Sequence, residues 1–164
     1  MIEGSVVLRT SRMCDVAGIE ALVNGYAAER VMLPRTAESI ELALDDFIVA
    51  TDEHGRVLAC GALKMYSPSL GEVASVAVAR EMHGRGLGTM VVTEVEHLAD
   101  ARGISELFAI TLTPRFFESL GYETTDRSLY PEKIRRDCAS CPRKFGCAES
   151  CMRRAMEGVI LSAA

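Results

Sequence analysis

The sequence predicts an α/β fold with a partly parallel central sheet. Segments rich in β-branched residues alternate along the chain with segments whose apolar residues recur at helical spacing, a pattern typical of strands alternating with helices. The chain of 164 residues is long enough for one domain with a sizeable core. Its 49% apolar and 25% charged residues are the composition of a folded chain and argue against a disordered one.

The first half of the chain predicts three strands and two helices. We expect, in order, a strand over residues 5–10, a helix from Asp15 to Tyr26, a helix from Thr36 to about Leu44 and two strands within residues 47–66. Asp15 and Thr36 are residue types that cap helix starts. The turn between the two strands falls at residues 52–55, so this pair adds an antiparallel portion to the sheet.

The second half predicts further alternation of strands and helices. We expect a strand over residues 72–79, a helix over 86–103, a strand over 106–111, a helix over 114–121 and a last core strand over 122–126. Pro114 suits a helix start, and Gly103 and Gly121 suit helix ends. We expect one main domain over residues 1–130, followed by a cysteine-rich C-terminal extension over residues 131–164.

The formal charge of −5 is unevenly distributed. Residues 131–154 hold seven basic and three acidic residues, and the rest of the chain holds eleven basic and twenty acidic ones. An acidic body argues against general nucleic-acid binding. We expect the basic segment to pair with the acidic body, with a phosphate ligand as the alternative. Without a long apolar run or a basic-then-apolar start, the sequence predicts a cytoplasmic protein with no membrane partner.

A glycine-rich turn stands between a strand-like segment and a helix-like one. Its glycines are Gly84, Gly86 and Gly88. A helix start presents backbone N–H groups that lack partners inside the helix, and glycines let these groups approach an anion closely. The turn therefore predicts a pyrophosphate cradle, with a plain glycine-rich turn as the alternative. Side chains that would add positive charge are Arg80, His83 and Arg85.

Two common phosphate motifs are excluded by the residues of this turn. The turn has no lysine, which the P-loop requires, and its glycines follow the spacing G-x-G-x-G instead of the dinucleotide fingerprint G-x-G-x-x-G. The turn resembles the acetyl-CoA loop of the GNAT acyltransferase superfamily, Q/R-x-x-G-x-G/A, with His83 in place of the usual Gln or Arg. The loop acts mostly through backbone amides, so this departure weakens the match little.

The resemblance extends from about residue 5 to residue 126. It is strongest in the stretches LPRT, CGALK, GEVASVAV and LFAITLTPRFFESLGY, which are similar to the acetyltransferase domain of short N-acetylglutamate synthases that lack the amino-acid-kinase domain. The resemblance implies the GNAT fold, a mixed and mostly antiparallel sheet flanked by helices. It also implies an N-acetyltransferase that moves acetyl from acetyl-CoA to the α-amino group of L-glutamate, the first step of arginine biosynthesis.

The resemblance also implies where acetyl-CoA binds. The strand before the loop would pair with the pantetheine arm, and the loop amides would hold the diphosphate. The implied cofactor residues are Val76, Ala77, Val78, His83, Gly84, Arg85, Gly86, Leu87, Gly88, Thr89 and Phe117. Many relatives place a tyrosine at the position of Phe117 to protonate the departing thiolate. With Phe117 there, the candidates for this role are Thr111, Thr113 or water.

Acetyl transfer to an amine also needs a base, because an α-amino group is largely protonated at neutral pH. Glu72 precedes an apolar strand, where partial desolvation could make it a base; the alternative is a solvated carboxylate at a strand end. Backbone N–H groups near Ala77 or Val78 would polarise the thioester carbonyl. We expect direct transfer within a ternary complex.

A glutamate substrate carries two carboxylates, which arginine grips with paired hydrogen bonds. By resemblance the substrate cations are Arg35 and Lys64, with Arg115 as a further candidate; each has a surface charge as its alternative. A second functional hypothesis is an acetyltransferase for another amine, such as glutamine, a polyamine or a protein N-terminus. A third is a CoA-binding sensor without turnover. Whether the chain forms a homodimer stays open.

Four cysteines near the C-terminus follow the spacing C-x2-C-x5-C-x3-C. They are Cys138, Cys141, Cys147 and Cys151. If a helix starts near Ala148, the last two thiols share a face, and four thiolates suit a structural Zn²⁺ ion. The alternatives are an iron–sulfur cluster, reduced thiols or disulfides. The remaining cysteines, Cys14 and Cys60, have apolar surroundings and are expected in the core.

Overall fold

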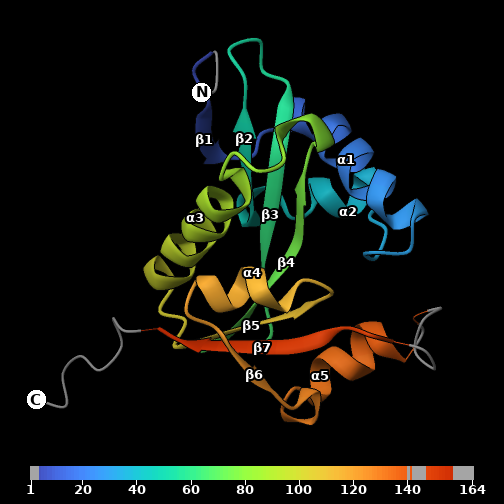
Figure 1. The fold of residues 1–164 in the computed structure, drawn as a ribbon, viewed down its shortest axis with the longest axis vertical. Coiled ribbons are helices and arrows are strands. Elements are labelled where there is room, and N and C mark those ends of the chain that lie inside the picture. Colours follow the sequence, from blue (N-terminus) through green and yellow to red (C-terminus); the bar gives the residue numbers. More distant parts are fainter. Residues whose placement is uncertain (1–3, 140, 142–146, 157–164) are drawn as a thin grey trace, which may run out of the picture. The chain divides into compact units, whose positions relative to one another are not determined.

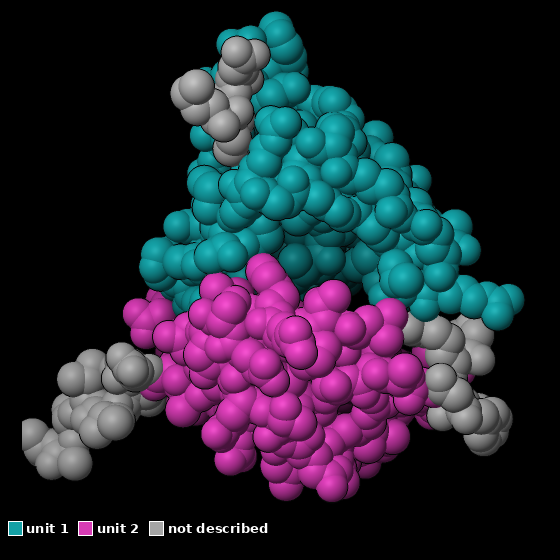
Figure 2. Space-filling view, in the orientation of Figure 1, with its two compact units in different colours: residues 1–64, 73–98 teal, residues 65–72, 99–164 magenta. Residues whose placement is uncertain are grey.

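The computed structural model describes residues 4–139, 141 and 147–156 (Figure 1). The chain divides into two compact units, coloured separately in Figure 2. The first unit comprises residues 1–64 and 73–98, and the second comprises residues 65–72 and 99–164. The chain therefore passes from one unit to the other more than once, so neither unit is a continuous stretch of sequence.

The first unit holds an antiparallel arrangement of strands and two complete helices. Its elements are β1 (Val7–Thr10), α1 (Val16–Ala28), α2 (Ala37–Glu41), β2 (Phe47–Thr51), β3 (Val57–Met65) except for its last residue, most of β4 (Leu70–Val78) and most of α3 (Leu87–Ala101). β2 pairs antiparallel with β1 and with β3, as the turn at residues 52–55 predicts. The described residues include no helix long and apolar enough to cross a membrane.

The core of the first unit explains why these segments fold as they do. Ile19 and Val23, one helical turn apart on α1, are completely buried. They belong to a cluster with Phe47 and Val49 of β2, whose strand is buried along its whole length. Apolar residues at helical spacing on α1 thus meet a continuous apolar run on β2, and burial of both apolar surfaces stabilises the unit.

The helix starts agree with the sequence at Thr36 and depart from it at Asp15. The Thr36 hydroxyl accepts a hydrogen bond from the Ser39 N–H at 3.1 Å, so Thr36 caps α2 as expected, although α2 ends at Glu41 instead of Leu44. Asp15 occupies the cap position of α1, but its side chain makes no capping bond to that helix. It accepts instead from the Arg9 guanidinium at 2.6 and 3.0 Å and from the Arg12 N–H at 2.7 Å.

The buried Asp15 carboxylate gives a testable dependence of stability on pH. Burial by itself raises the pKa of Asp15, but the bonds from Arg9 and Arg12 outweigh burial and hold this pKa below 3.8. The interaction therefore stabilises the fold above pH 3.8 and is lost as pH falls below that value. We expect Asp15→Asn to lower the free energy of unfolding by about 2 kcal/mol at pH 7. In urea titrations the difference from wild type should shrink near pH 3; a constant difference would contradict the assignment.

The second unit contains the C-terminal strands. Its elements are β5 (Glu106–Thr111), α4 (Pro114–Ser119), β6 (Glu123–Thr125), α5 (Pro131–Lys133), a π-helical turn over Ile134–Cys138 and β7 (Ser150–Ala155), together with the first three residues of β4. Those three residues pair parallel with β5, from Leu70 opposite Glu106 to Glu72 opposite Phe108. Phe108 stacks on Tyr130 with ring centroids 4.1 Å apart, which forms the centre of a small apolar cluster.

β7 corrects the expectation that residues 122–126 form the last core strand. β7 pairs antiparallel with β5 and with β6, so the strand order is β1-β2-β3-β4-β5-β7-β6. Without β7, the second edge of β5 would leave its backbone N–H and C=O groups without strand partners. The strand lies within residues 131–164, so part of the expected extension belongs to the sheet. The sheet is mixed and mostly antiparallel, as the resemblance implies.

Two further expectations about cysteines have opposite outcomes. Cys60 is completely buried on β3, and its thiol lies 3.4 Å from the Ser75 carbonyl oxygen. Cys14 is exposed, so its placement in the core was wrong. Cys14 lies in the short 3₁₀ turn Met13–Asp15 that precedes α1, where its neighbour Asp15 turns inward instead.

Candidate active site

The glycine loop lies where β4 ends and α3 begins, both within the first unit. Gly84 and Gly86 have φ angles of +76° and +82°, the left-handed region that only glycine adopts easily. A Cβ atom built on either residue would meet no atom within 4 Å, so glycine is needed there for the backbone conformation and not to avoid crowding. Both residues are exposed to solvent. The loop backbone therefore faces outward at the start of a helix.

The start of α3 supplies the electrostatics of this loop. The helix has 15 residues, and its first backbone N–H groups have no acceptor inside the helix by geometry. Leu87 and Val91 are buried and anchor the first turn, while Arg85 and Thr89 are exposed to solvent. The positive end of the helix dipole and the exposed Arg85 favour an anion at the loop.

The strand before the loop is irregular at Ser75. This residue has a φ of +54°, which is uncommon for a residue other than glycine and costs of order 1–3 kcal/mol. Val76 and Val78 are half-buried and Ala77 is buried. β4 thus departs from regular extended backbone at Ser75. The sequence carries no signal for this feature, because serine has no preference for a positive φ.

The carbonyl of Val78 is contacted by two side chains that the sequence does not connect. The Tyr26 hydroxyl donates to the Val78 carbonyl oxygen at 2.6 Å, and His83 Nε2 lies 3.0 Å from the same oxygen and 2.8 Å from the Tyr26 hydroxyl. The two rings are nearly parallel, with centroids 6.4 Å apart. Burial raises the pKa of Tyr26, so its hydroxyl stays protonated as a donor. His83 therefore contacts β4 as well as belonging to the loop.

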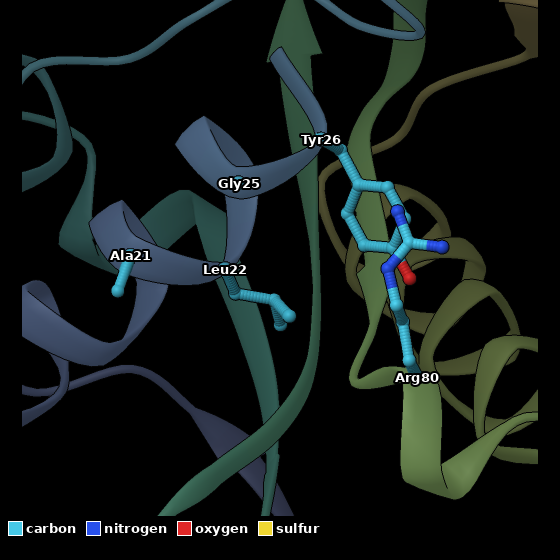
Figure 3. A pocket seen from close by; sticks show the side chains of 5 residues that line it. All are labelled: Ala21, Leu22, Gly25, Tyr26 and Arg80. Carbon is cyan, nitrogen blue, oxygen red and sulfur yellow. The ribbon is translucent and has the colours of Figure 1, made fainter. Parts of the chain in front are cut away.

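A shallow pocket of about 170 Å³ opens beside this cluster (Figure 3). Its lining residues are Ala21, Leu22, Gly25, Tyr26 and Arg80. The Arg80 guanidinium lies over the Tyr26 ring, 4.9 Å from its centroid, as Figure 3 shows, and it forms an ion pair with Glu29. Arg80 thus contacts Tyr26 of α1 and Glu29, the residue that follows this helix.

Glu72 is a buried residue inside β4, and 3% of its surface is exposed. The alternative of a solvated strand-end carboxylate is therefore wrong. Its carboxylate accepts from the Lys133 ammonium at 2.9 and 3.2 Å and from the Tyr66 hydroxyl at 3.1 Å. Lys133 also donates to Asp137 at 2.7 Å. Sequence reasoning missed Lys133 and Tyr66 as partners of Glu72. A lysine in a basic segment is usually a surface charge, and no local pattern connects Tyr66 with Glu72.

The pKa shifts in this cluster follow from its charges. Burial by itself lowers the pKa of Lys133, but the carboxylates of Glu72 and Asp137 outweigh burial and raise it above 10.5. The Lys133 side chain therefore stays an ammonium at neutral pH. Burial, with Glu72 as a further cause, raises the pKa of Tyr66, so its hydroxyl remains a hydrogen-bond donor.

The remaining catalytic and cofactor candidates lie on β5 and α4 of the second unit. Thr111 is buried, and its hydroxyl accepts from the Thr113 N–H at 2.9 Å and lies 3.1 Å from the Thr113 hydroxyl. Phe117 is buried with its ring edge-on to Tyr122, 5.1 Å between centroids. The two threonine hydroxyls form a local pair, whereas the Phe117 ring belongs to an aromatic cluster.

The three candidate substrate cations have different environments. Arg35 donates from its guanidinium to the Ser39 hydroxyl at 3.2 Å and to the Ser39 carbonyl at 3.3 Å, and it lies over the Phe47 ring. Lys64 is half-buried near the end of β3, and Arg115 is exposed on α4. Arg35 and Lys64 belong to the first unit and Arg115 to the second.

The C-terminal cysteines do not form the expected metal site in the part of the chain that the structure describes. No group of three or more Cys, His, Asp or Glu residues there is arranged to hold a metal ion. Cys151 lies on β7 opposite Ile110 and Thr125, so the helix expected near Ala148 was wrong. Burial raises the pKa of the Cys151 thiol to about 11, which disfavours the thiolate that a metal requires.

Cys147 has a different neighbour. Its sulfur lies 3.5 and 3.6 Å from the two terminal nitrogens of the Arg127 guanidinium. Among the described residues, none of the cysteines forms a disulfide. These residues therefore do not fit the expected zinc ion or the alternative iron–sulfur cluster. Residues 140 and 142–146 of the segment lie outside the described residues.

Comparisons of sequence agree with this fold. Residues 19–122 match the Acetyltransferase (GNAT) family. An uncharacterized N-acetyltransferase of Chlorobaculum tepidum is 37% identical over 145 residues, which cover 88% of this chain and 93% of that protein. An amino-acid acetyltransferase of Mycobacterium tuberculosis is 33% identical over 71% of this chain and 67% of its own length. An amino-acid acetyltransferase of Neisseria meningitidis is 29% identical over 84% of this chain but only 32% of its own length.

Solved structures of similar proteins have the same fold. A Mycobacterium tuberculosis protein in complex with CoA and a second molecule superposes with a TM-score of 0.79 at 28% identity, covering 91% of this chain and 98% of that one. N-acetylglutamate synthase from Neisseria gonorrhoeae, complexed with coenzyme A and N-acetyl-glutamate, superposes with a TM-score of 0.81 at 26% identity, covering 94% of this chain and 36% of that one. With the family match over residues 19–122 and the fold in agreement, this chain belongs to the GNAT family of acetyltransferases.

Proposed function

We propose that the protein transfers the acetyl group of acetyl-CoA to the α-amino group of L-glutamate, the first step of arginine biosynthesis. The observation that supports acetyl-CoA binding is the exposed loop at the start of α3, where Gly84 and Gly86 take left-handed backbone angles. The glutamate acceptor is supported by two similarities: 33% identity to an amino-acid acetyltransferase and a TM-score of 0.81 to an N-acetylglutamate synthase. The chain spans about a third of the latter enzyme.

In this proposal the loop holds the coenzyme by its diphosphate. Backbone N–H groups from Gly84 to Gly88 donate to the phosphate oxygens, helped by the dipole of α3 and by Arg85. The backbone of Val76–Val78 pairs with the pantetheine arm and directs the thioester along β4. Holding thioester and amine in line supplies a large part of the rate, because a bimolecular step becomes effectively unimolecular.

The chemistry requires the α-ammonium group to lose two protons and the departing thiolate to gain one. Glu72 takes a proton from the α-ammonium group, directly or through a water, and the free amine attacks the thioester carbon. N–H groups near Ala77 and Val78 stabilise the oxyanion. The carbon–sulfur bond then breaks, and the thiolate takes a proton from the Thr111 hydroxyl or from water. That donor regains a proton from the nitrogen of the tetrahedral intermediate, so the nitrogen's second proton ends on the thiol and the amide forms. The products are N-acetylglutamate and free CoA.

Three cations would select a dicarboxylate. Arg35, Lys64 and Arg115 are the candidates for the two carboxylates of glutamate, because arginine and lysine grip carboxylates through charge-assisted hydrogen bonds. Arg35 already donates to Ser39, which fixes its guanidinium in one orientation. The proposal requires such a fixed cation, since a preoriented guanidinium loses less entropy on binding.

Charge reversal tests the substrate cations. We expect Arg35→Glu and Lys64→Glu each to raise KM for L-glutamate at least about 100-fold, because each removes a charge-assisted contact and adds a repulsion of similar size. KM for acetyl-CoA should stay within about threefold of wild type, which corresponds to less than ~1 kcal/mol. Steady-state kinetics with each substrate varied in turn measure both values. An unchanged KM for glutamate would remove that residue from the substrate site.

The decisive experiment for the function is an acceptor screen. Purified protein and acetyl-CoA are incubated with each of the twenty amino acids, and free thiol is followed over time. We expect L-glutamate to give the highest kcat/KM. A preference for glutamine or for a cationic amine would favour the second hypothesis, a different acceptor. Tight CoA binding without thiol release across a wide amine panel would favour the sensor instead.

A further inference from the structure

We propose that Lys133 and Asp137 are positioning residues that hold Glu72 in place and balance its charge before and after it accepts a proton from the substrate. This inference rests on the proposed function, in which Glu72 is the base. The three side chains form a chain of contacts within the second unit: Lys133 bridges Glu72 at 2.9 Å and Asp137 at 2.7 Å. Lys133 and Glu72 are separated by 61 residues in the sequence, so the contact is purely tertiary.

The burial of the trio makes its charge balance important. The side chains of Glu72 and Lys133 are only 3% and 9% exposed, and that of Asp137 is 19% exposed. A buried carboxylate without a partner would be strongly disfavoured in its ionised form. The Lys133 ammonium compensates the Glu72 charge, so the carboxylate is available as an ionised base at neutral pH. A base that was already protonated could not take the proton of the substrate.

Asp137 compensates the charge of Lys133 after proton transfer, when Glu72 is neutral. The ionised trio carries two carboxylates and one ammonium, a net charge of −1. When Glu72 takes a proton from the α-ammonium of the substrate, the trio becomes neutral, and Lys133 keeps Asp137 as its ionic partner. With Glu72 and Lys133 alone, the same proton would leave an uncompensated buried ammonium, which is costly. Asp137 therefore lowers the free-energy cost of protonating Glu72.

Other charged and titratable groups around Glu72 are consistent with this balance. The Tyr66 hydroxyl donates to Glu72 at 3.1 Å. Arg136 lies over the Tyr66 ring, 4.7 Å from its centroid. Cys151 also interacts electrostatically with Glu72, and burial keeps that thiol neutral by raising its pKa. Lys133 contacts both Glu72 and Asp137 alongside these further groups.

Two variants should move the pH profile in opposite directions. Lys133→Met removes a positive charge from Glu72, which favours its protonated form, so the acid-limb midpoint of kcat/KM for L-glutamate should rise by about one to two pH units. Asp137→Asn removes a negative charge while keeping the Lys133–Glu72 contact, so the same midpoint should fall by about 0.5 pH unit. Arg135→Met is the matched control, because Arg135 is an exposed cation of the same helical turns and pairs with Glu132. Its midpoint should equal that of wild type.

A purely structural role predicts a different result. If Lys133 and Asp137 only stabilise the fold, both variants lower kcat or the melting temperature without shifting the acid limb, and that outcome overturns the inference. Shifts of the same sign in the two variants also overturn it. If Lys133→Met fails to fold, the isosteric Asp137→Asn variant still tests the sign.

A second readout separates this inference from the proposed function. The carbon NMR signal of the Glu72 carboxyl group reports its protonation in the protein without substrate. Opposite shifts by NMR together with an unshifted kinetic profile would mean that Glu72 is coupled to the trio but is not the base, which overturns the inference and leaves acetyl transfer intact. Absence of turnover by the wild type with every amino acid would instead overturn the proposed function, and the role of Glu72 with it.

Discussion

The Gly86→Val variant is expected to weaken CoA binding by about 30- to 100-fold, because the loop backbone could no longer keep its present conformation. Gly86 has a φ of +82°, and a β-branched side chain at such an angle is a strong outlier. Left-handed backbone costs roughly 1–2 kcal/mol for a residue with a Cβ atom. Relief of this strain would turn one or more N–H groups away from the diphosphate, each a charge-assisted bond of about 1.5–3 kcal/mol.

A matched control separates binding from backbone strain. Gly55 has a φ of +81° in the turn between β2 and β3, and a Cβ atom there also meets nothing within 4 Å. Gly55→Val should therefore destabilise the protein about as much as Gly86→Val does, while its Kd for CoA stays at the wild-type value. Isothermal titration calorimetry measures Kd, and urea unfolding measures stability. Equal losses of affinity in the two variants would show that the Gly84–Gly88 loop has no special role in holding the coenzyme.

Lys133→Met is expected to lower the free energy of unfolding by about 3–5 kcal/mol, the cost of removing one partner from a buried ion pair. Glu72→Gln should cost less, because Lys133 retains Asp137 at 2.7 Å as a partner. The double variant Glu72→Gln with Lys133→Met should recover much of the loss, since it leaves no buried charge at position 72. Urea titrations of the wild type, the two single variants and the double variant give the coupling free energy.

The Lys133–Glu72 ion pair also predicts how the free energy of unfolding depends on pH in the alkaline range. The pKa of Lys133 is raised in the fold above its ordinary value of 10.5. Its interaction therefore contributes fully below pH 10.5 and is lost as pH rises through the folded-state pKa. The stability difference between wild type and Lys133→Met should stay constant from pH 7 to 10 and shrink above it. Additive single variants, or a difference that grows at high pH, would contradict the ion-pair account.

The glycine loop between β4 and α3 was predictable from the sequence because its signal is local. Glycines at positions 84 and 86 supply the positive φ angles, and the apolar residues that begin with Leu87 supply the buried face of the next helix. The strands at residues 47–66 and the cap at Thr36 were predictable for the same reason, since hairpins and caps involve residues close together in the chain.

Predictions near the C-terminus failed where local patterns compete with long-range pairing. The cysteine spacing suggested a helix and a metal site, whereas Cys151 lies on β7 between β5 and β6. A strand of six residues has little local preference of its own, and the open edge of β5 decides its conformation. Cys14 was misplaced because apolar neighbours in sequence do not show which side chain of a turn faces inward.

By itself, the sequence determined the α/β class and the position of the glycine loop, since both depend on residue types at short spacing, and its resemblance to known acetyltransferases indicated the family. Tertiary structure alone decided the surroundings of Glu72 and Val78. Lys133 reaches Glu72 across 61 residues and Tyr26 reaches Val78 across 52. Local sequence patterns do not predict such contacts. The free energy that brings the two side chains together comes from burial of the helices and strands that carry them.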